Sequence, residues 1–198
     1  AMHRPVSMKE IEQAKKRFTY EKLFSFAVEI EKEEHAVSKG TIYNIKSLEH
    51  TSQYINDLPF ELTDSQKAVF DDMKKKAVEG VRINALVQGD VGSGKTVQAF
   101  LMMFAMADSG YQSVLMAPTQ ILAKQHYEKI KESAERYGYK AAYITGETKG
   151  KDKKNLLAGI AGGEYTFVIG THSVLSSSIV YHKLALVVID EEHKFGVS

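Results

Sequence analysis

The sequence predicts an α/β fold in which a parallel sheet is flanked by helices and preceded by a helical N-terminal segment. Three observations carry this prediction. From residue 59 onward, short apolar runs alternate with longer amphipathic stretches, which is typical of strands joined by helical crossovers. The runs are continuously apolar, as in strands covered on both faces. Gly110 and Gly138 follow the helical stretches, where helices usually end.

Composition excludes several classes of protein. The chain has no cysteine, which rules out a disulfide-stapled secreted fold and a thiolate metal site. Its formal net charge is +1, so any nucleic-acid contact must come from local geometry and not from a basic surplus. No apolar stretch reaches the ~20 residues that a bilayer requires, and the N-terminus has no secretory signal. We therefore expect a cytoplasmic protein.

Residues 1–58 are expected to form the helical segment. Ser7 and Glu10 have the spacing of a capping box, and apolar residues follow at helical intervals up to Phe18. A second helix is expected from residue 19 to 39, and a short one between 41 and 58. Because such apolar stripes need a partner surface, we expect these helices to pack on the domain that follows.

Residues 59–198 are expected to form the α/β domain. Thr63 and Gln66 form a second capping box, which starts a helix that Gly80 ends. The expected strands are 84–88, 113–117, 141–145, 165–169 and 184–189. The expected helices between them are 95–109, 120–137 and 151–161.

The stretch "GDVGSGKT", from Gly89 to Thr96, matches the phosphate-binding pattern G-x-x-x-x-G-K-[ST] between an expected strand and an expected helix. Its glycines let the backbone direct N–H groups at a phosphate, and the helix that follows adds its positive end. Lys95 is expected to reach the β- and γ-phosphates, and the Thr96 hydroxyl to bind Mg²⁺. The nucleotide-binding candidates in this loop are Gly89, Gly92, Ser93, Gly94, Lys95 and Thr96.

The stretch "LVVIDEEH" places carboxylates at the end of the last expected strand. In a parallel sheet, ligands bind at the carboxyl ends of the strands, so Asp190 should reach the same edge as the phosphate loop. One carboxylate there can hold Mg²⁺, and we assign this role to Asp190. A second can orient and deprotonate a water molecule for attack on the γ-phosphorus, and we assign this role to Glu191. Lys95, Asp190 and Glu191 are thus the catalytic candidates.

These motifs resemble those of superfamily-two helicases. "DEEH" is similar to motif II, "APTQILAKQHY" at 117–127 to motif Ia, and "TG" at 145–146 to motif Ib. "IGTHSVL" at 169–175 resembles the DNA-contacting motif that follows, and "LPFELTDSQ" at 58–66 the adenine-reading stretch. In detail, "QGDVGSGKT", "MAPTQILAKQHY" and "DEEHKFGV" resemble the RecG family of branch-migrating DNA helicases. Residues 14–30 look like the helical stretch before the motor in that family.

The resemblance implies a RecA-like P-loop NTPase lobe, the first motor lobe of an ATP-dependent DNA helicase that remodels branched DNA in recombination and repair. ATP and Mg²⁺ are the implied cofactors. Branched or forked DNA, a second motor lobe and a wedge domain of the same chain are the implied partners. Neither the second lobe nor its arginine is present in these 198 residues. We therefore expect them alone to bind ATP weakly and hydrolyse it slowly, and the lobe to be cut just after motif II.

The resemblance also implies DNA contacts and adenine recognition. It assigns the adenine edge to Gln66, which by spacing alone is a capping-box residue, and it gives His193 the coupling of the ATP site to DNA. Threonine hydroxyls and backbone N–H groups that follow the strands suit phosphate oxygens. The DNA-contact or coupling candidates are Pro118, Thr119, Thr145, Gly146, Thr171, His172 and His193. Thr119 is equally expected as a helix N-cap, and Thr145-Gly146 as a turn.

Two alternatives stay open at this stage. RecG proteins usually carry D-E-Q-H, whereas Glu192 stands here in the glutamine place, so a transcription–repair coupling translocase is a close alternative. A non-motor P-loop enzyme would share the phosphate loop but has no need of the 117–127 and 169–175 stretches. A non-catalytic scaffold is disfavoured because Lys95 and Glu191 are intact. The lysines at 74–76 and 149–154 are expected to be solvated surface and not a DNA site.

Overall fold

The computed structural model describes residues 43–90 and 92–190, all within the compact unit Thr41–Ser198. The helices expected over 7–18 and 19–39 lie outside the described residues, as do Glu191, Glu192 and His193. The division expected at residue 58 stays a prediction. Among the described residues, none of the helices has the length and apolar character of a transmembrane span.

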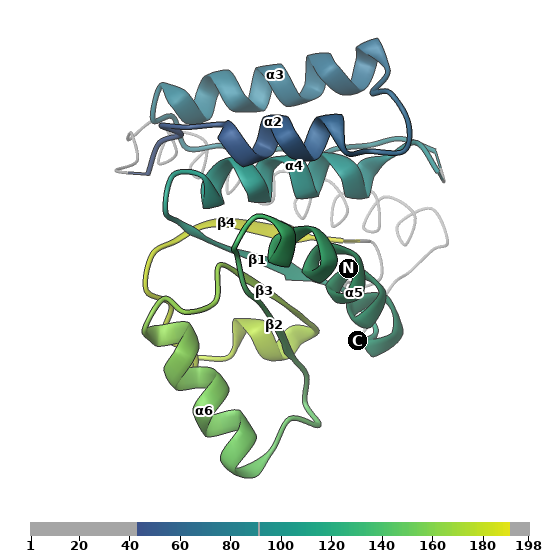
Figure 1. Cartoon of the computed structure of the whole chain (residues 1–198). Helices are drawn as coiled ribbons and strands as arrows, with labels where there is room; N and C mark the ends of the chain where they lie inside the picture. The colour runs from purple at the N-terminus through teal and green to yellow at the C-terminus, as the bar shows by residue number, and fades with distance from the viewer. Residues whose placement is uncertain (1–42, 91, 191–198) are drawn as a thin grey trace, which may run out of the picture. The chain divides into compact units, whose positions relative to one another are not determined.

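The sheet has four parallel strands in the order β2-β3-β1-β4 (Figure 1). In chain order the strands are β1 (Gln112–Met116), β2 (Ala141–Ile144), β3 (Phe167–Gly170) and β4 (Leu184–Ile189). Four of the five expected strands are confirmed, with small shifts at their ends, and their parallel pairing is confirmed as well. At Gly170 a Cβ atom would lie 1.9 Å from the Ile144 carbonyl oxygen, so the close approach of β3 to β2 requires glycine.

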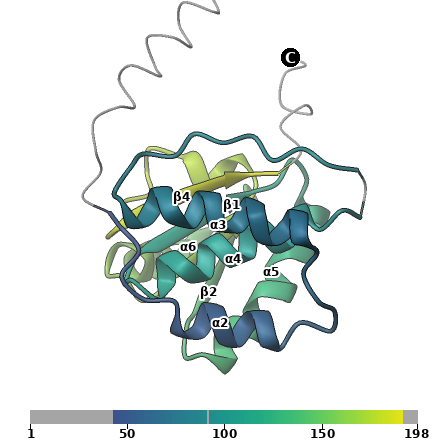
Figure 2. The ribbon, with the colours of Figure 1, turned by 90° about the horizontal axis from the view of Figure 1, so that it is seen from above.

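The strand expected over 84–88 is wrong: these residues form an irregular connection between α3 and α4. An apolar run indicates burial, but a strand exists only where its backbone groups pair with a neighbour. No strand of the described sheet pairs with this connection, and Leu86 is 70% exposed. Figure 2 shows the connection running beside β4, with which it lines a cavity.

Helices cover both faces of the sheet (Figure 1). Their bounds are α2 (Glu49–Asn56), α3 (Asp64–Val78), α4 (Lys95–Ala107), α5 (Gln120–Arg136) and α6 (Gly150–Ala161), with the short 3-10 helix η1 (His172–Leu175) after β3. The expected helices over 64–80, 95–109, 120–137 and 151–161 are thus confirmed, and the short one between 41 and 58 is α2. The capping box that starts α3 is also confirmed, because the Thr63 and Gln66 side chains each accept from the other's backbone N–H.

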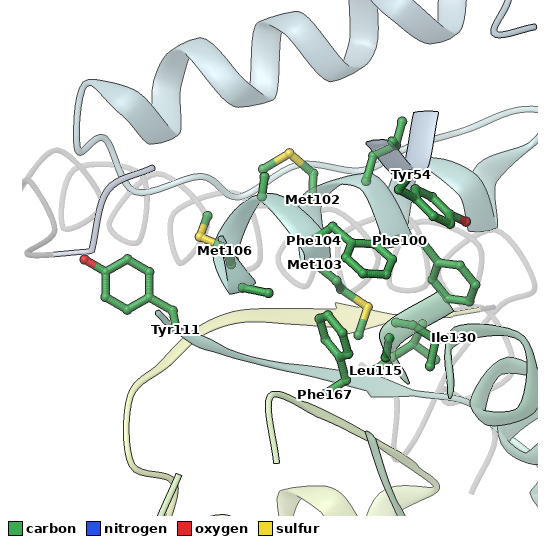
Figure 3. Packing of buried hydrophobic residues seen from close by; sticks show 14 of the residues in the cluster. Tyr54, Phe100, Met102, Met103, Phe104, Met106, Tyr111, Leu115, Ile130 and Phe167 are labelled. Atoms are coloured by element: carbon green, nitrogen blue, oxygen red, sulfur yellow. The ribbon is translucent and has the colours of Figure 1, made fainter. Parts of the chain in front are cut away.

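Two apolar clusters hold the layers together. Leu115 of β1 faces the cluster that contains α4, whereas its neighbours Val114 and Met116 face the cluster that contains Ile160 of α6. This alternation follows from the two-residue period of a strand. Within α4, Leu101 and Phe104 have no exposed surface, because α2 and α3 cover the side of α4 that faces away from the sheet (Figure 1). The Phe104 ring packs against Tyr54 of α2 and Phe167 of β3 (Figure 3). The continuous apolar run of this helix is thereby explained.

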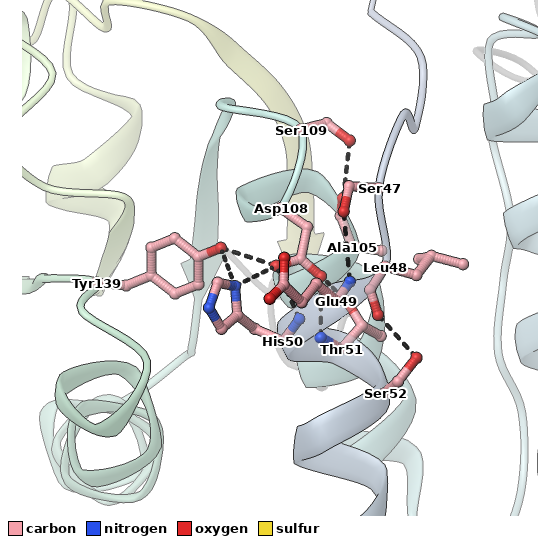
Figure 4. A network of polar contacts seen from close by, with 10 residues as sticks. All are labelled: Ser47, Leu48, Glu49, His50, Thr51, Ser52, Ala105, Asp108, Ser109 and Tyr139. Atoms are coloured by element: carbon pink, nitrogen blue, oxygen red, sulfur yellow. Dashed lines mark hydrogen bonds and ion pairs between the residues drawn. The ribbon is translucent and has the colours of Figure 1, made fainter.

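A buried carboxylate joins α2 to the end of α4 (Figure 4). The N-cap residue of α2, Leu48, makes no capping hydrogen bond with its side chain. Instead, Asp108 accepts from the backbone N–H groups of His50 at 3.3 Å and Thr51 at 2.9 Å, so it acts as an N-cap supplied by another helix. The Thr51 hydroxyl donates at 2.7 Å, the Tyr139 hydroxyl at 2.7 Å, and the His50 Nδ1 lies 2.9 Å away. The Asp108 side chain is only 1% exposed.

These donors decide the ionisation of Asp108. Burial acts to raise the pKa of Asp108, but the hydrogen bonds from Thr51, Tyr139 and His50 outweigh it and hold this pKa below its usual value. Burial, together with the hydrogen bond to Asp108, raises the pKa of Tyr139. The phenol therefore stays a donor and the carboxylate an acceptor at neutral pH. Together they fix α2 onto the sheet layer.

Candidate nucleotide-binding site

The predicted phosphate loop lies between the α3–α4 connection and α4. Gly92 and Gly94 have φ angles of 83° and 86°, in the left-handed region that favours glycine. Helix α4 begins at Lys95, directly after these glycines, and no side chain caps its first turn. An uncapped helix start presents backbone N–H groups and the positive end of the helix dipole, which suits an anion such as a phosphate.

Lys95 lies across the phosphate loop. Its Nζ donates to the carbonyl oxygens of Gly89 at 2.6 Å and of Asp90 at 2.8 Å. Both acceptors belong to the phosphate loop, so the ammonium is held against the backbone of the loop. Phosphate oxygens would be stronger acceptors than these neutral carbonyls, because both partners would then carry charge. The residues present therefore fit a bound polyphosphate.

Gln66 connects the start of α3 to the phosphate loop. Its Oε1 accepts from the Thr63 backbone N–H at 2.9 Å, and its Nε2 donates to the Ser93 carbonyl oxygen at 2.9 Å. A Cβ atom added at Gly94 would come within 2.3 Å of this Nε2, so the Gln66 side chain would have to move, and the φ angle of 86° favours glycine at this position. The buried Gln98 donates back to the Gln66 carbonyl oxygen at 3.0 Å. Gln66, which was expected to read adenine, therefore also connects the phosphate loop to the start of α3.

The strand ends form one row at the carboxyl edge of the sheet. In the observed register Ile144 pairs with Gly170, Gly170 with Met116, and Met116 with Ile189. The residue after each strand therefore starts a loop at the same edge. Asp190 is fixed there by its backbone N–H, which donates to the Met116 carbonyl oxygen at 2.9 Å.

Sequence reasoning gave no role to His126, although it belongs to the 117–127 stretch. This residue lies on α5, and its Nε2 is 2.7 Å from Oδ2 of Asp190. The His126 side chain is 9% exposed and the Asp190 side chain 28% exposed. The available signal was helical spacing, because His126 shares the buried stripe of α5 with Ala123, Ile130 and Ala134. A polar residue on such a stripe indicates a specific partner.

One cavity of about 1190 Å³ is lined by Gly89, Lys95 and Thr96 of the phosphate-loop candidates and by Asp190, whereas Gln66, Gly92, Ser93 and Gly94 do not line it. Lys95 and Thr96 line it from α4, His126 from α5 and Asp190 from the end of β4. Residues of the α3–α4 connection and of β4 form much of the remaining wall, together with residues of α3, α4 and β1. The structure therefore brings the predicted phosphate-binding and metal-binding residues to a common space, although they are 94 positions apart at Thr96 and Asp190 (190 − 96).

The predicted DNA candidates follow β1, β2 and β3 in the same row. Thr119 is exposed and caps α5 by accepting from the Leu122 backbone N–H at 3.3 Å, which confirms its expected role as an N-cap. Thr145 is buried at 4% exposure and its hydroxyl accepts from Glu147 N at 3.4 Å, so it holds the expected turn. Gly146 and His172 are exposed, whereas Pro118 and Thr171 are half-buried. The exposed members of the set leave this edge accessible to a ligand.

The first lysine-rich stretch forms ion pairs along its helix, and the second has exposed lysines. Lys74 pairs with Asp71 and Lys76 with Asp72 along α3, as in a solvated helix face. In the second stretch Lys149, Lys151 and Lys154 are exposed.

Over residues 43–90 and 92–190, no group of three or more His, Cys, Asp or Glu side chains could hold a metal ion by itself. A Mg²⁺ ion at Asp190 would therefore share its coordination with Thr96, phosphate oxygens and water.

Comparison with known proteins gives a consistent picture. Residues 63–198 match the DEAD/DEAH box helicase family. Over its whole length the chain is 38% identical to ATP-dependent DNA helicase RecG of Bacillus subtilis (strain 168) and 40% identical to that of Streptococcus pneumoniae serotype 4. The chain spans 29% of the length of each of these relatives.

Solved structures agree with the sequence comparison. A structure of RecG bound to a three-way DNA junction superposes with a TM-score of 0.79 at 34% identity, covering 98% of this chain and 27% of that one. A hypothetical ATP-dependent RNA helicase from Sulfolobus tokodaii shares the fold, with a TM-score of 0.55 at 22% identity over 74% of this chain and 42% of that one. The expected RecA-like helicase fold is confirmed, and the chain belongs to the DEAD/DEAH box helicase family.

Proposed function

We propose that this chain is the nucleotide-binding motor lobe of an ATP-dependent DNA helicase of the RecG type, which remodels branched DNA. The observation that carries the proposal is that Lys95, Thr96 and Asp190 line one cavity at the edge of the sheet where the DNA candidates also lie. A non-motor P-loop enzyme would need the cavity but not the row of loops beside it. The RecG-named relatives match the whole chain, including the part before residue 63.

The proposed nucleotide is ATP with Mg²⁺. The left-handed turns at Gly92 and Gly94 and the uncapped start of α4 would cradle its phosphates, with Lys95 moving from the loop carbonyls to the β- and γ-phosphates. Thr96 and Asp190 would hold Mg²⁺, which when bound neutralises charge on the phosphate oxygens. Glu191 follows Asp190 in the sequence and would orient the attacking water and accept its proton. Gln66 would read the adenine edge from its place beside the loop.

DNA would contact the loops that follow β1, β2 and β3. Threonine and backbone groups there suit phosphate oxygens and carry no sequence information, which fits a motor that moves along any DNA. The proposed contacts are Pro118, Thr119, Gly146, Thr171 and His172, with Thr145 holding the turn and His193 coupling DNA to the nucleotide. A second motor lobe and a wedge domain in the same full-length protein would complete the machine.

Hydrolysis assays on the full-length protein test the proposal. We expect ATP turnover to rise more with a three-way junction than with a linear duplex of the same length and composition. Lys95→Ala should abolish turnover with both. If Lys95→Ala abolishes turnover but neither DNA changes the wild-type rate, the chain is a P-loop enzyme that is not a DNA motor. If linear duplex stimulates as strongly as the junction, the branched-DNA assignment is wrong and a duplex translocase is favoured.

A further inference from the structure

The His126–Asp190 pair joins two elements that the proposed mechanism treats separately. Asp190 lies at the end of β4 and is the proposed Mg²⁺ ligand, whereas His126 lies in the middle of α5. The 2.7 Å separation of Nε2 and Oδ2 is a short, charge-assisted hydrogen bond when the carboxylate is ionised. In this arrangement the imidazole carries a hydrogen on Nε2 and donates it to Oδ2.

Packing alone does not explain a histidine at this position. The other buried positions of the α5 stripe are alanine or isoleucine, and the Phe100 and His126 rings lie nearly perpendicular to each other at a centroid distance of 6.3 Å. Within the described part of the chain, the buried Nδ1 has no hydrogen-bond partner. Such a nitrogen costs free energy that an apolar side chain of similar size would avoid. The cost is offset only at the other nitrogen, by the contact with Asp190.

We propose that His126 is a positioning residue for the metal site: its Nε2–H holds the Asp190 carboxylate, through Oδ2, in the orientation in which it binds Mg²⁺. This inference rests on the proposed function, in which Asp190 is the Mg²⁺ ligand. Partners that orient a ligating group from behind keep it in one rotamer, so the ion does not have to order it. Backbone pairing with Met116 fixes the main chain of Asp190, and His126 fixes the side chain.

A matched pair of variants isolates the hydrogen bond. His126→Gln keeps an N–H donor at the position of Nε2, whereas His126→Met has nearly the same shape and no donor. In the full-length protein at saturating ATP, we expect His126→Met to raise the Mg²⁺ concentration for half-maximal hydrolysis about 10–100-fold. His126→Gln should stay within about threefold of wild type, because the donor is retained.

Metal binding is also measured without turnover. Electron paramagnetic resonance of Mn²⁺ in the presence of ADP should show the same weakening for His126→Met and its rescue by His126→Gln. Lys129→Ala, on the exposed side of α5, is the control and should match wild type. Melting curves of the variants are used to set the assay temperature. If His126→Met unfolds below that temperature, His126→Leu is used in its place.

The outcomes separate this inference from the proposed function. If Asp190→Asn leaves Mg²⁺ dependence and Mn²⁺ binding unchanged, Asp190 is not the metal ligand and the proposed function fails. If Asp190→Asn weakens both but the apolar His126 variant matches His126→Gln, the positioning role is overturned while the metal site stands. Equal losses in the glutamine and methionine variants would likewise overturn it, because the donor would then not matter.

Discussion

Two aspartates at the ends of neighbouring elements have opposite surroundings. Asp108, just after α4, is 1% exposed and accepts from two backbone N–H groups and two hydroxyls. Asp190, just after β4, is 28% exposed, accepts from His126 and lies on the wall of the large cavity. A carboxylate whose oxygens are used up by the protein's own donors stabilises the fold. A partly exposed carboxylate that borders a cavity beside the candidate phosphate loop is placed to bind a ligand.

The two sets of surroundings distinguish a carboxylate that stabilises the fold from one that is a candidate ligand. The hydrogen-bond donors to Asp108 come from α2 and from Tyr139, which precedes β2, and they satisfy the buried charge. At Asp190 the phosphate loop supplies further groups to the same cavity, Lys95 and Thr96 among them. Substitutions in the two regions should therefore separate stability from activity.

The largest effect is expected on activity at the nucleotide site. In the full-length protein, Lys95→Ala and Glu191→Gln should each lower ATP turnover by about a thousandfold or more, because transition-state charge and the attacking water lose their partners. Steady-state hydrolysis measures the loss, and a fluorescent nucleotide measures binding. Glu191→Gln should still bind nucleotide; normal turnover in that variant would show that Glu191 is not the base.

The next effect is expected on stability at Asp108. Asp108→Ala should lower the free energy of unfolding by about 2–4 kcal/mol, because buried N–H and O–H donors lose their acceptor. Urea denaturation of this chain measures the change. Asp190→Asn is the matched control and should cost no more than about 1 kcal/mol, since its side chain is partly exposed. Equal losses at the two positions would contradict the claim that Asp108 stabilises the fold more than Asp190 does.

At acidic pH, Asp108 should no longer contribute to the free energy of unfolding. Its folded-state pKa is held below the usual value, so the unfolded state binds the proton more readily. The stabilisation is therefore fully present above the ordinary aspartate pKa of about 4 and is lost as the pH falls through the lower folded-state value. Urea midpoints of wild type and Asp108→Asn should converge in this acidic range. A difference that stays constant down to the acid transition would contradict the assignment.

A smaller effect is expected at Gln66, which is part of the capping box of α3 and also contacts the candidate phosphate loop. Gln66→Ala should cost about 1 kcal/mol of stability through loss of the capping box. It should also reduce discrimination between ATP and GTP in the full-length protein, if the side chain reads adenine. Competition binding with the two nucleotides measures the second effect. Thr63→Ala is the control, because it removes the cap and leaves the Gln66 amide in place.

The smallest effect is expected on the lysine-rich face of α6. Replacing Lys151 and Lys154 by glutamine should change the free energy of unfolding by less than about 0.5 kcal/mol, because both side chains are exposed. DNA-stimulated hydrolysis by the full-length protein should stay near the wild-type rate. A large loss of stimulation would show that this face binds DNA.

Local patterns predicted most of the secondary structure because their causes are local. The capping box of Thr63 and Gln66, the glycine ends of helices and the continuous apolar runs each act within a few residues. The strand expected at 84–88 was wrong for a non-local reason, because pairing requires a neighbouring strand and an apolar run does not reveal one. His126 and Asp108 were missed for the same reason: their partners lie 64 and 58 positions away in the sequence.

The class of fold followed from the sequence, as did the candidate phosphate loop from Gly89 to Thr96 and the candidate carboxylate Asp190, since each is written in residue types at short spacing. The folded chain was needed to show which strands pair, that Asp108 caps a helix other than its own, and that His126 contacts Asp190. These depend on which segments distant in sequence are brought to hydrogen-bonding distance, and that is settled by packing of the sheet and its helices and not by any local pattern.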